Sequence, residues 1–105
     1  SELARQALEQ EIVSEVRSAV RKLVSAQQTI GAASEAVRLA ETQVAAEKER
    51  LRLGLTTNYE LLQREKGLAS ARNTHLDAII AYQNALTDIA KTTGTILADR
   101  GITIE

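Results

Sequence analysis

The residues able to do acid–base or metal chemistry are few and poorly placed for it. His75 is the single histidine, and Asp77, two residues further on, would lie on another face of a helix. Glu60 and Glu65 are five residues apart and diverge on a helix, a poor geometry for paired carboxylates. No phosphate-binding glycine loop, Ser/His/Asp set or H-E-x-x-H motif occurs. The sequence therefore predicts no enzyme and no catalytic, cofactor-binding or metal site; His75 is interpreted as a packed seam residue, with a ligand role as the alternative.

Composition restricts the class of protein further. The 105 residues carry 13 basic and 14 acidic side chains, and no basic patch with interleaved aromatics occurs, which argues against nucleic acid as a partner. No apolar run approaches the ~20 residues that a membrane-spanning helix needs. Hydrophobic residues make up 44% of the chain, yet the aromatics are two tyrosines only. Because compact cores draw much of their buried area from aromatics, we expect narrow helix seams instead.

The centre of the chain predicts a reversal between two helices. Gly54 suits the position after a helix C-terminus, because glycine adopts positive φ without steric cost. Thr57 and Glu60 have the spacing of a capping box, in which each side chain bonds to the other residue's backbone N–H. We therefore expect a helix over about 2–53, a tip at 54–57 and a second helix from about 58, running antiparallel as one helical hairpin.

The first half of the chain has a heptad pattern of large aliphatics and alanines. The large aliphatics recur every seven residues and form a first column. The alanines form a second column, which lies three or four residues from the first and ends at Glu47, where the apolar pattern stops. Gly31 lies within this pattern beside two alanines, and we interpret it as a close backbone contact. The first column is Val16, Leu23, Ile30, Val37, Val44 and Leu51, and the second is Ile12, Ala19, Ala26, Ala33 and Ala40.

The second half carries two apolar stripes, which predicts packing against a neighbour on each flank, as in a bundle or a closed ring of helices. Near the tip the first stripe becomes polar at Glu65 and Arg72. Thr92–Gly94 either ends this helix or is bridged, with the helix then continuing to about 98 before an irregular tail over 99–105. The first stripe is Leu61, Leu68, His75, Tyr82, Ile89 and Ile96, interleaved with Ile79 and Leu86, and the second is Leu62, Ala69, Leu76, Ile80, Ala90 and Leu97.

Two paired helices have little interior, so an exposed second seam needs a partner. We expect this chain to be a fragment of something larger, an oligomer, or both.

At the tip and its flanks the sequence resembles the outer membrane efflux proteins of the TolC family. The likeness covers about residues 12–101 and needs no insertion from Val16 to Gly94. Its individual motifs are weak, and the specificity lies in their order and spacing. The matching segments are Glu15-Val16-Arg17-Ser18-Ala19, Ala40-Glu41, Leu53-Gly54-Leu55-Thr56-Thr57, Glu60-Leu61-Leu62, Ala69-Ser70-Ala71-Arg72, and Ala85-Leu86 through Thr93-Gly94.

The resemblance implies a passive periplasmic segment of a trimeric outer membrane channel for efflux or type I secretion in a Gram-negative bacterium. The chain would be the second helical hairpin of a larger channel protein, within a periplasmic α-barrel. Its partners would be the other protomers, a periplasmic adaptor protein and, indirectly, an inner membrane pump. No cofactor is implied. The tip that would meet the adaptor is Leu53, Gly54, Leu55, Thr56 and Thr57.

The resemblance also implies where the channel entrance would lie. Glu60 and Gln63 stand where the family often has acidic residues lining the constriction, and Gln63 departs from that pattern. Leu51 and Thr56 replace a tyrosine and an arginine that tie the gate shut in the best-known member. For Glu60 the alternative role is to complete its capping box, and both roles can hold together. The competing function is a free-standing coiled-coil scaffold or adaptor hairpin that oligomerises through its exposed seams.

Overall fold

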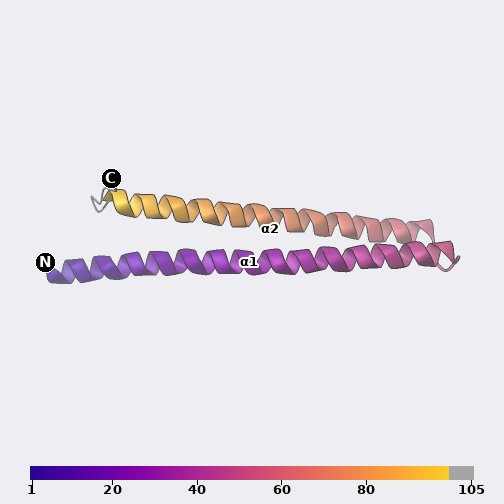
Figure 1. Cartoon of the computed structure of the whole chain (residues 1–105), viewed down its shortest axis with the longest axis horizontal. Helices are drawn as coiled ribbons and strands as arrows, with labels where there is room; N and C mark the ends of the chain where they lie inside the picture. The colour runs from indigo at the N-terminus through magenta and orange to yellow at the C-terminus, as the bar shows by residue number, and fades with distance from the viewer. Residues whose placement is uncertain (100–105) are drawn as a thin grey trace. The chain divides into compact units, whose positions relative to one another are not determined.

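The computed structural model describes residues 1–99, and within them the chain is all-α. Helix α1 spans Glu2–Arg52 and helix α2 spans Asn58–Asp99, joined by the short turn over 53–57 (Figure 1). The predicted helical hairpin is therefore confirmed, with the helix boundaries within one residue of those expected at the turn. The predicted tail over 99–105 lies outside the described residues except for Asp99, which is the last residue of α2.

Contacts between the helices divide the chain into two units. The turn unit is Gln28–Ile80, and it contains the end of α1, the turn and the start of α2. The terminal unit combines Ser1–Gln27 with the segment that begins at Ala81. In each unit a stretch of α1 packs against an antiparallel stretch of α2.

The turn unit contains every residue that the structure describes as buried. Four of them are small or medium apolar side chains, Ala33, Ala40, Val44 and Ala78, and the fifth is the charged residue Glu47. Alanine at these positions leaves room for the backbones of the two helices to approach closely. Around the buried residues lies a half-buried layer on both helices, which includes His75: Ile30, Val37, Leu51, Leu61, Leu68, Ala71, His75 and Ile79.

The heptad columns of α1 form the seam as predicted, with one difference in each column. Leu23 and Ile30 are half-buried and Val44 is buried, whereas Val16 is exposed, so the first column enters the seam one heptad later than predicted. The second column does not end at Ala40. It continues into Glu47, seven residues on, which is as buried as the alanines before it.

On α2 the six main members of the first predicted stripe face α1 and are half-buried. Of the two residues interleaved with them, Ile79 is half-buried, whereas Leu86 is 39% exposed. The column beside this stripe was not predicted, and it is built from small residues: Ala71, Ala78, Ala85 and Thr92. Each helix thus contributes one column of larger side chains and one dominated by alanine. The second predicted stripe is exposed except for Leu97, so within the described residues α1 covers only one of the two seams.

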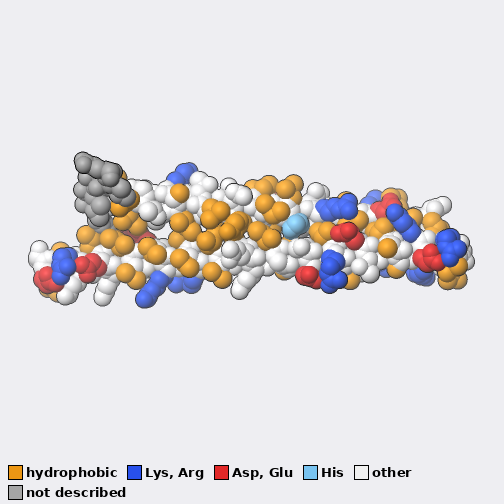
Figure 2. All heavy atoms as spheres, viewed as in Figure 1, with side chains coloured by type: hydrophobic (Ala, Val, Ile, Leu, Met, Phe, Trp, Pro, Cys, Tyr) orange, Lys and Arg blue, Asp and Glu red, His pale blue; other side chains and the backbone are white. Residues whose placement is uncertain are grey.

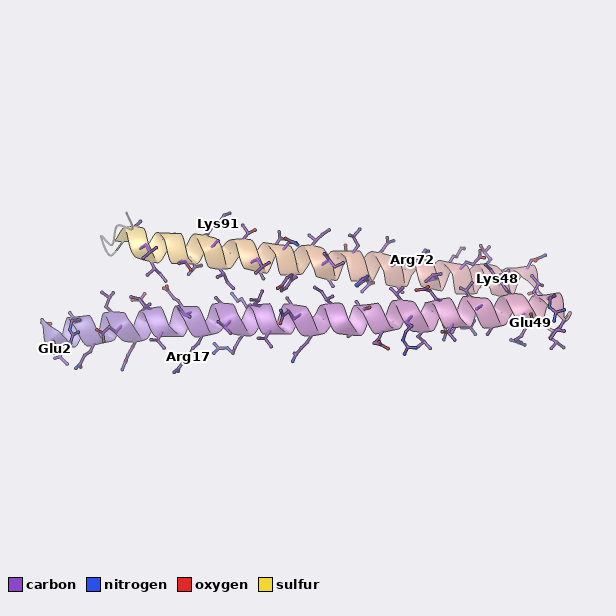
Figure 3. All side chains as sticks on the ribbon, in the orientation of Figure 1. Glu2, Arg17, Lys48, Glu49, Arg72 and Lys91 are labelled. Atoms are coloured by element: carbon purple, nitrogen blue, oxygen red, sulfur yellow. The ribbon has the colours of Figure 1, made fainter. Side chains whose placement is uncertain are left out.

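The terminal unit is packed more loosely. None of its described residues is buried, and its seam is half-buried throughout, from Leu8 and Ile12 on α1 to Tyr82 and Ile89 on α2. A groove of about 920 Å³ lies between the two helices, lined by residues of 11–22 and 81–96. The Gln27 amide nitrogen donates across the seam to the Tyr82 hydroxyl at 3.4 Å. Arg17 projects from the side of α1 away from α2 (Figure 3).

Two glycine predictions were resolved by the structure. Gly94 is bridged, because α2 continues through it to Asp99. The close contact predicted at Gly31 was wrong: a Cβ built there meets nothing within 4 Å in the described part of the chain. Gly31 is exposed because it lies off both seam columns, and α1 passes through it without interruption.

Candidate functional site at the turn

The C-terminus of α1 is closed by a pair of backbone hydrogen bonds around Gly54. The Gly54 N–H donates to the Leu51 carbonyl at 3.0 Å, and the Leu55 N–H donates to the Arg50 carbonyl at 2.9 Å. This is the Schellman arrangement, which satisfies helix carbonyls that would otherwise lack partners. It requires a left-handed residue, and Gly54 has φ of 75°, the only positive φ in the described residues. The predicted role of Gly54 is confirmed.

The N-terminus of α2 is capped by Thr57. Its hydroxyl oxygen accepts from the Glu60 backbone N–H at 3.2 Å, which is one arm of the predicted capping box. The return arm is not formed among the described residues, and the Glu60 carboxylate is exposed without a hydrogen bond to residues 1–99. Gln63, the other pore-lining candidate, is also exposed. The Glu60 side chain is therefore not occupied by capping and faces solvent in this chain.

The turn presents an apolar surface to solvent. Leu55 is 63% exposed and Leu53 is 55% exposed, although both are large aliphatic side chains. Tyr59 and Leu62, in the first two turns of α2, are exposed as well. We call these four residues the tip surface. Thr56 does not belong to it, because its side chain is half-buried and points back into the helical pair.

Behind the tip surface lies a charged cluster centred on a buried carboxylate. Glu47 is only 5% exposed, and its two oxygens accept from the Arg50 guanidinium at 3.3 and 3.4 Å. The Arg64 Nε, across the seam on α2, lies 4.0 Å from the same carboxylate. The Thr56 hydroxyl bonds to it from the turn. We call Glu47, Arg50, Thr56 and Arg64 the Glu47 cluster.

The environment of Glu47 favours its ionised form. The hydrogen bond from Thr56 lowers the pKa of Glu47 most, and the charges of Arg50 and Arg64 lower it further. Burial acts in the opposite direction and does not prevail. Two helices place fewer atoms around a side chain than a globular core does. Glu47 therefore loses less hydration than a carboxylate buried in a globular core would lose.

The cluster has a second link to the turn through Arg50. The same guanidinium that donates to Glu47 also donates to the Leu55 backbone carbonyl at 3.4 Å. The Leu55 N–H meanwhile donates to the Arg50 carbonyl. Both backbone polar groups of Leu55 are therefore held by Arg50, and its neighbour Thr56 is held by Glu47.

This cluster was not predicted, although the sequence contains a signal for it. Glu47 lies seven residues after Ala40 in the alanine column of α1, and Arg64 lies seven residues before Ala71 in the alanine column of α2. Each column thus reaches a charged residue one heptad closer to the turn. A carboxylate in register with a seam predicts a buried ion pair, whereas it was interpreted only as the end of the apolar pattern.

Other charged residues near the turn lie on the surface. The Arg52–Glu49 pair is exposed, and Glu49 projects on the side of α1 away from α2 (Figure 3). Acidic and basic side chains are mixed over this part of the visible surface, with no large patch of one sign (Figure 2). No group of three or more possible metal ligands occurs within residues 1–99. Neither helix, over the described residues, has a segment long and apolar enough to cross a membrane.

Comparison with known proteins adds nothing to this geometry. No protein-family model, curated protein or solved structure matches the chain at a significant level.

Proposed function

We propose that this chain is a helical hairpin of the periplasmic α-barrel of a trimeric outer membrane channel, of the kind found in the TolC family. In this role it is a passive conduit without catalytic activity, and its turn docks to a periplasmic adaptor protein. The observation that carries the proposal is a turn whose backbone is fixed at both ends while its leucines are exposed.

The turn has the properties of a docking surface. Schellman bonds on one side and the Thr57 cap on the other hold the backbone, so little conformational entropy is lost when a partner binds. Leu53 and Leu55 supply exposed apolar area at its end. Exposed apolar side chains on a preorganised backbone lose less entropy on binding than the same side chains on a mobile loop.

The exposed second stripe of α2 supports assembly with further helices. In the turn unit Leu62, Leu76 and Ile80 are about half exposed, on a face that α1 does not cover. A helix in a closed ring contacts a neighbour on each flank and needs a second seam of this kind. In such a ring Glu60 and Gln63 would lie near the entrance, and three copies of Glu60 would favour cations.

Binding to an adaptor hairpin tests the docking role. The chain is titrated by calorimetry with the helical hairpin of an adaptor encoded beside its gene, together with Leu55→Glu and Leu39→Glu. Both leucines are exposed to a similar degree, but Leu39 lies on α1 away from the turn. We expect Leu55→Glu to lose at least tenfold in affinity and Leu39→Glu to bind as the unchanged chain does. Equal loss in both variants, or no binding by the unchanged chain, contradicts a docking turn and favours a scaffold hairpin.

A further inference from the structure

The Glu47 cluster connects three parts of the turn unit that the backbone alone does not connect. Glu47 and Arg50 belong to α1, Thr56 to the turn and Arg64 to α2. The buried carboxylate therefore contacts both helices and the segment between them. No other described residue combines burial with a charge.

Helix packing alone does not require a charge at this position. The four preceding members of the same column are alanines, and a buried ion pair is often no more stabilising than apolar residues of similar volume. What a carboxylate supplies, and an aliphatic side chain does not, is directional bonding to specific partners. Here the partners are the Thr56 hydroxyl and the guanidinium that holds the Leu55 carbonyl.

We propose that Glu47 is a positioning residue for the tip surface: through Arg50 and Thr56 it holds Leu55 in one orientation from beneath. The Schellman bonds fix where the helix ends, and the Glu47 cluster fixes the chain beyond Gly54, where the turn leaves α1. The effect on partner binding rests on the proposed docking function. The effect on the turn itself does not.

Amide exchange of the full chain, measured by NMR, tests the positioning role at Leu55. The Leu55 N–H is hydrogen-bonded in the turn, whereas the amides of 36–44 lie within α1 and serve as the internal reference. In Glu47→Leu we expect the Leu55 amide to exchange at least about tenfold faster relative to that reference, since bonds to a charged group are lost. Glu49→Gln is the matched control, because its exposed carboxylate pairs with Arg52 and does not contact the turn.

Two substitutions of Thr56, in the turn, test its contact with Glu47 without altering the seam of α1. Thr56→Val removes the hydroxyl at similar volume and should accelerate Leu55 exchange in the same sense, while Thr56→Ser keeps the hydroxyl and should restore protection. Unchanged Leu55 exchange in both Glu47→Leu and Thr56→Val overturns the proposal. Equal acceleration of Leu55 and of the α1 reference also overturns it, because that result describes general loss of stability.

The adaptor titration separates this inference from the docking function. Faster Leu55 exchange with weaker adaptor binding in Glu47→Leu supports both. If Leu55 exchanges faster in Glu47→Leu but the chain without substitutions does not bind the adaptor, the positioning role is retained and the docking function is rejected. Normal exchange in the variants with normal docking removes the positioning role alone.

Discussion

The same substitution, glycine to alanine, should have opposite effects on stability at Gly54 and at Gly67. Gly54 has φ of 75°, whereas Gly67 lies within α2. A Cβ built on either residue meets nothing within 4 Å, so steric contact contributes at neither position. The two variants therefore isolate the conformational preference of the backbone.

The expected magnitudes follow from the two conformations. At Gly54 an alanine costs about 1–2 kcal/mol in the left-handed region, and reduced freedom of the unfolded chain offsets about 0.4–1 kcal/mol of this. At Gly67 the same change gains about 0.8–1 kcal/mol from helix propensity. The two variants should thus differ by about 2 kcal/mol in the free energy of unfolding.

Urea unfolding followed by circular dichroism measures this difference, with all variants at one protein concentration so that association affects them equally. Gly54→Ala should unfold at lower urea than the unchanged chain and Gly67→Ala at higher urea. If Gly54→Ala is as stable as Gly67→Ala, residue 54 does not need a left-handed backbone. The hairpin turn described above would then be wrong.

Three further predictions concern the turn and the exposed stripe. Thr57→Ala should lower the free energy of unfolding by about 1 kcal/mol through loss of the α2 cap, measured by the same urea titration, and Thr57→Ser should restore most of it. The pKa of Glu47 is lowered in the folded chain, so its contribution to stability is present above the ordinary value of 4.5 and is lost as pH falls through the lowered value. Urea midpoints measured as pH is lowered should therefore fall less steeply in Glu47→Gln than in the unchanged chain, and an identical fall would contradict an ionised Glu47. Sedimentation equilibrium should show self-association that Leu76→Glu weakens and Leu39→Glu does not, since Leu76 belongs to the second stripe; a monomer at all concentrations would contradict a second seam.

Much of the hairpin could be predicted because its signals are local. The missing Cβ of Gly54 and the spacing of Thr57 to Glu60 determine one helix end and one helix start, whatever the rest of the chain does. The six-member stripe of α2 also depends only on helical periodicity, and all of it faces α1. The return arm of the capping box was predicted but is absent from residues 1–99, because an exposed Glu60 side chain keeps its hydration and rotamer freedom when unbonded.

The candidate site was only partly predictable. Leu53, Gly54 and Leu55 were identified from the turn pattern and the resemblance, and their geometry suits an exposed tip. Thr56 was grouped with them, yet it points inward to Glu47. Periodicity says which face of a helix is apolar, but it does not say which residue of a five-residue turn folds back over that face.

The sequence by itself thus determined two helices, their reversal at Gly54 and the columns that pair them, since each depends on residues within a few positions of one another. Only the tertiary structure decided that Glu47 is buried and shared among Arg50, Thr56 and Arg64. These partners come from a helix, a turn and a second helix, and their meeting depends on the register of the hairpin. Whether a charge in a seam column is buried in an ion pair can be stated only when the residue across the seam is known.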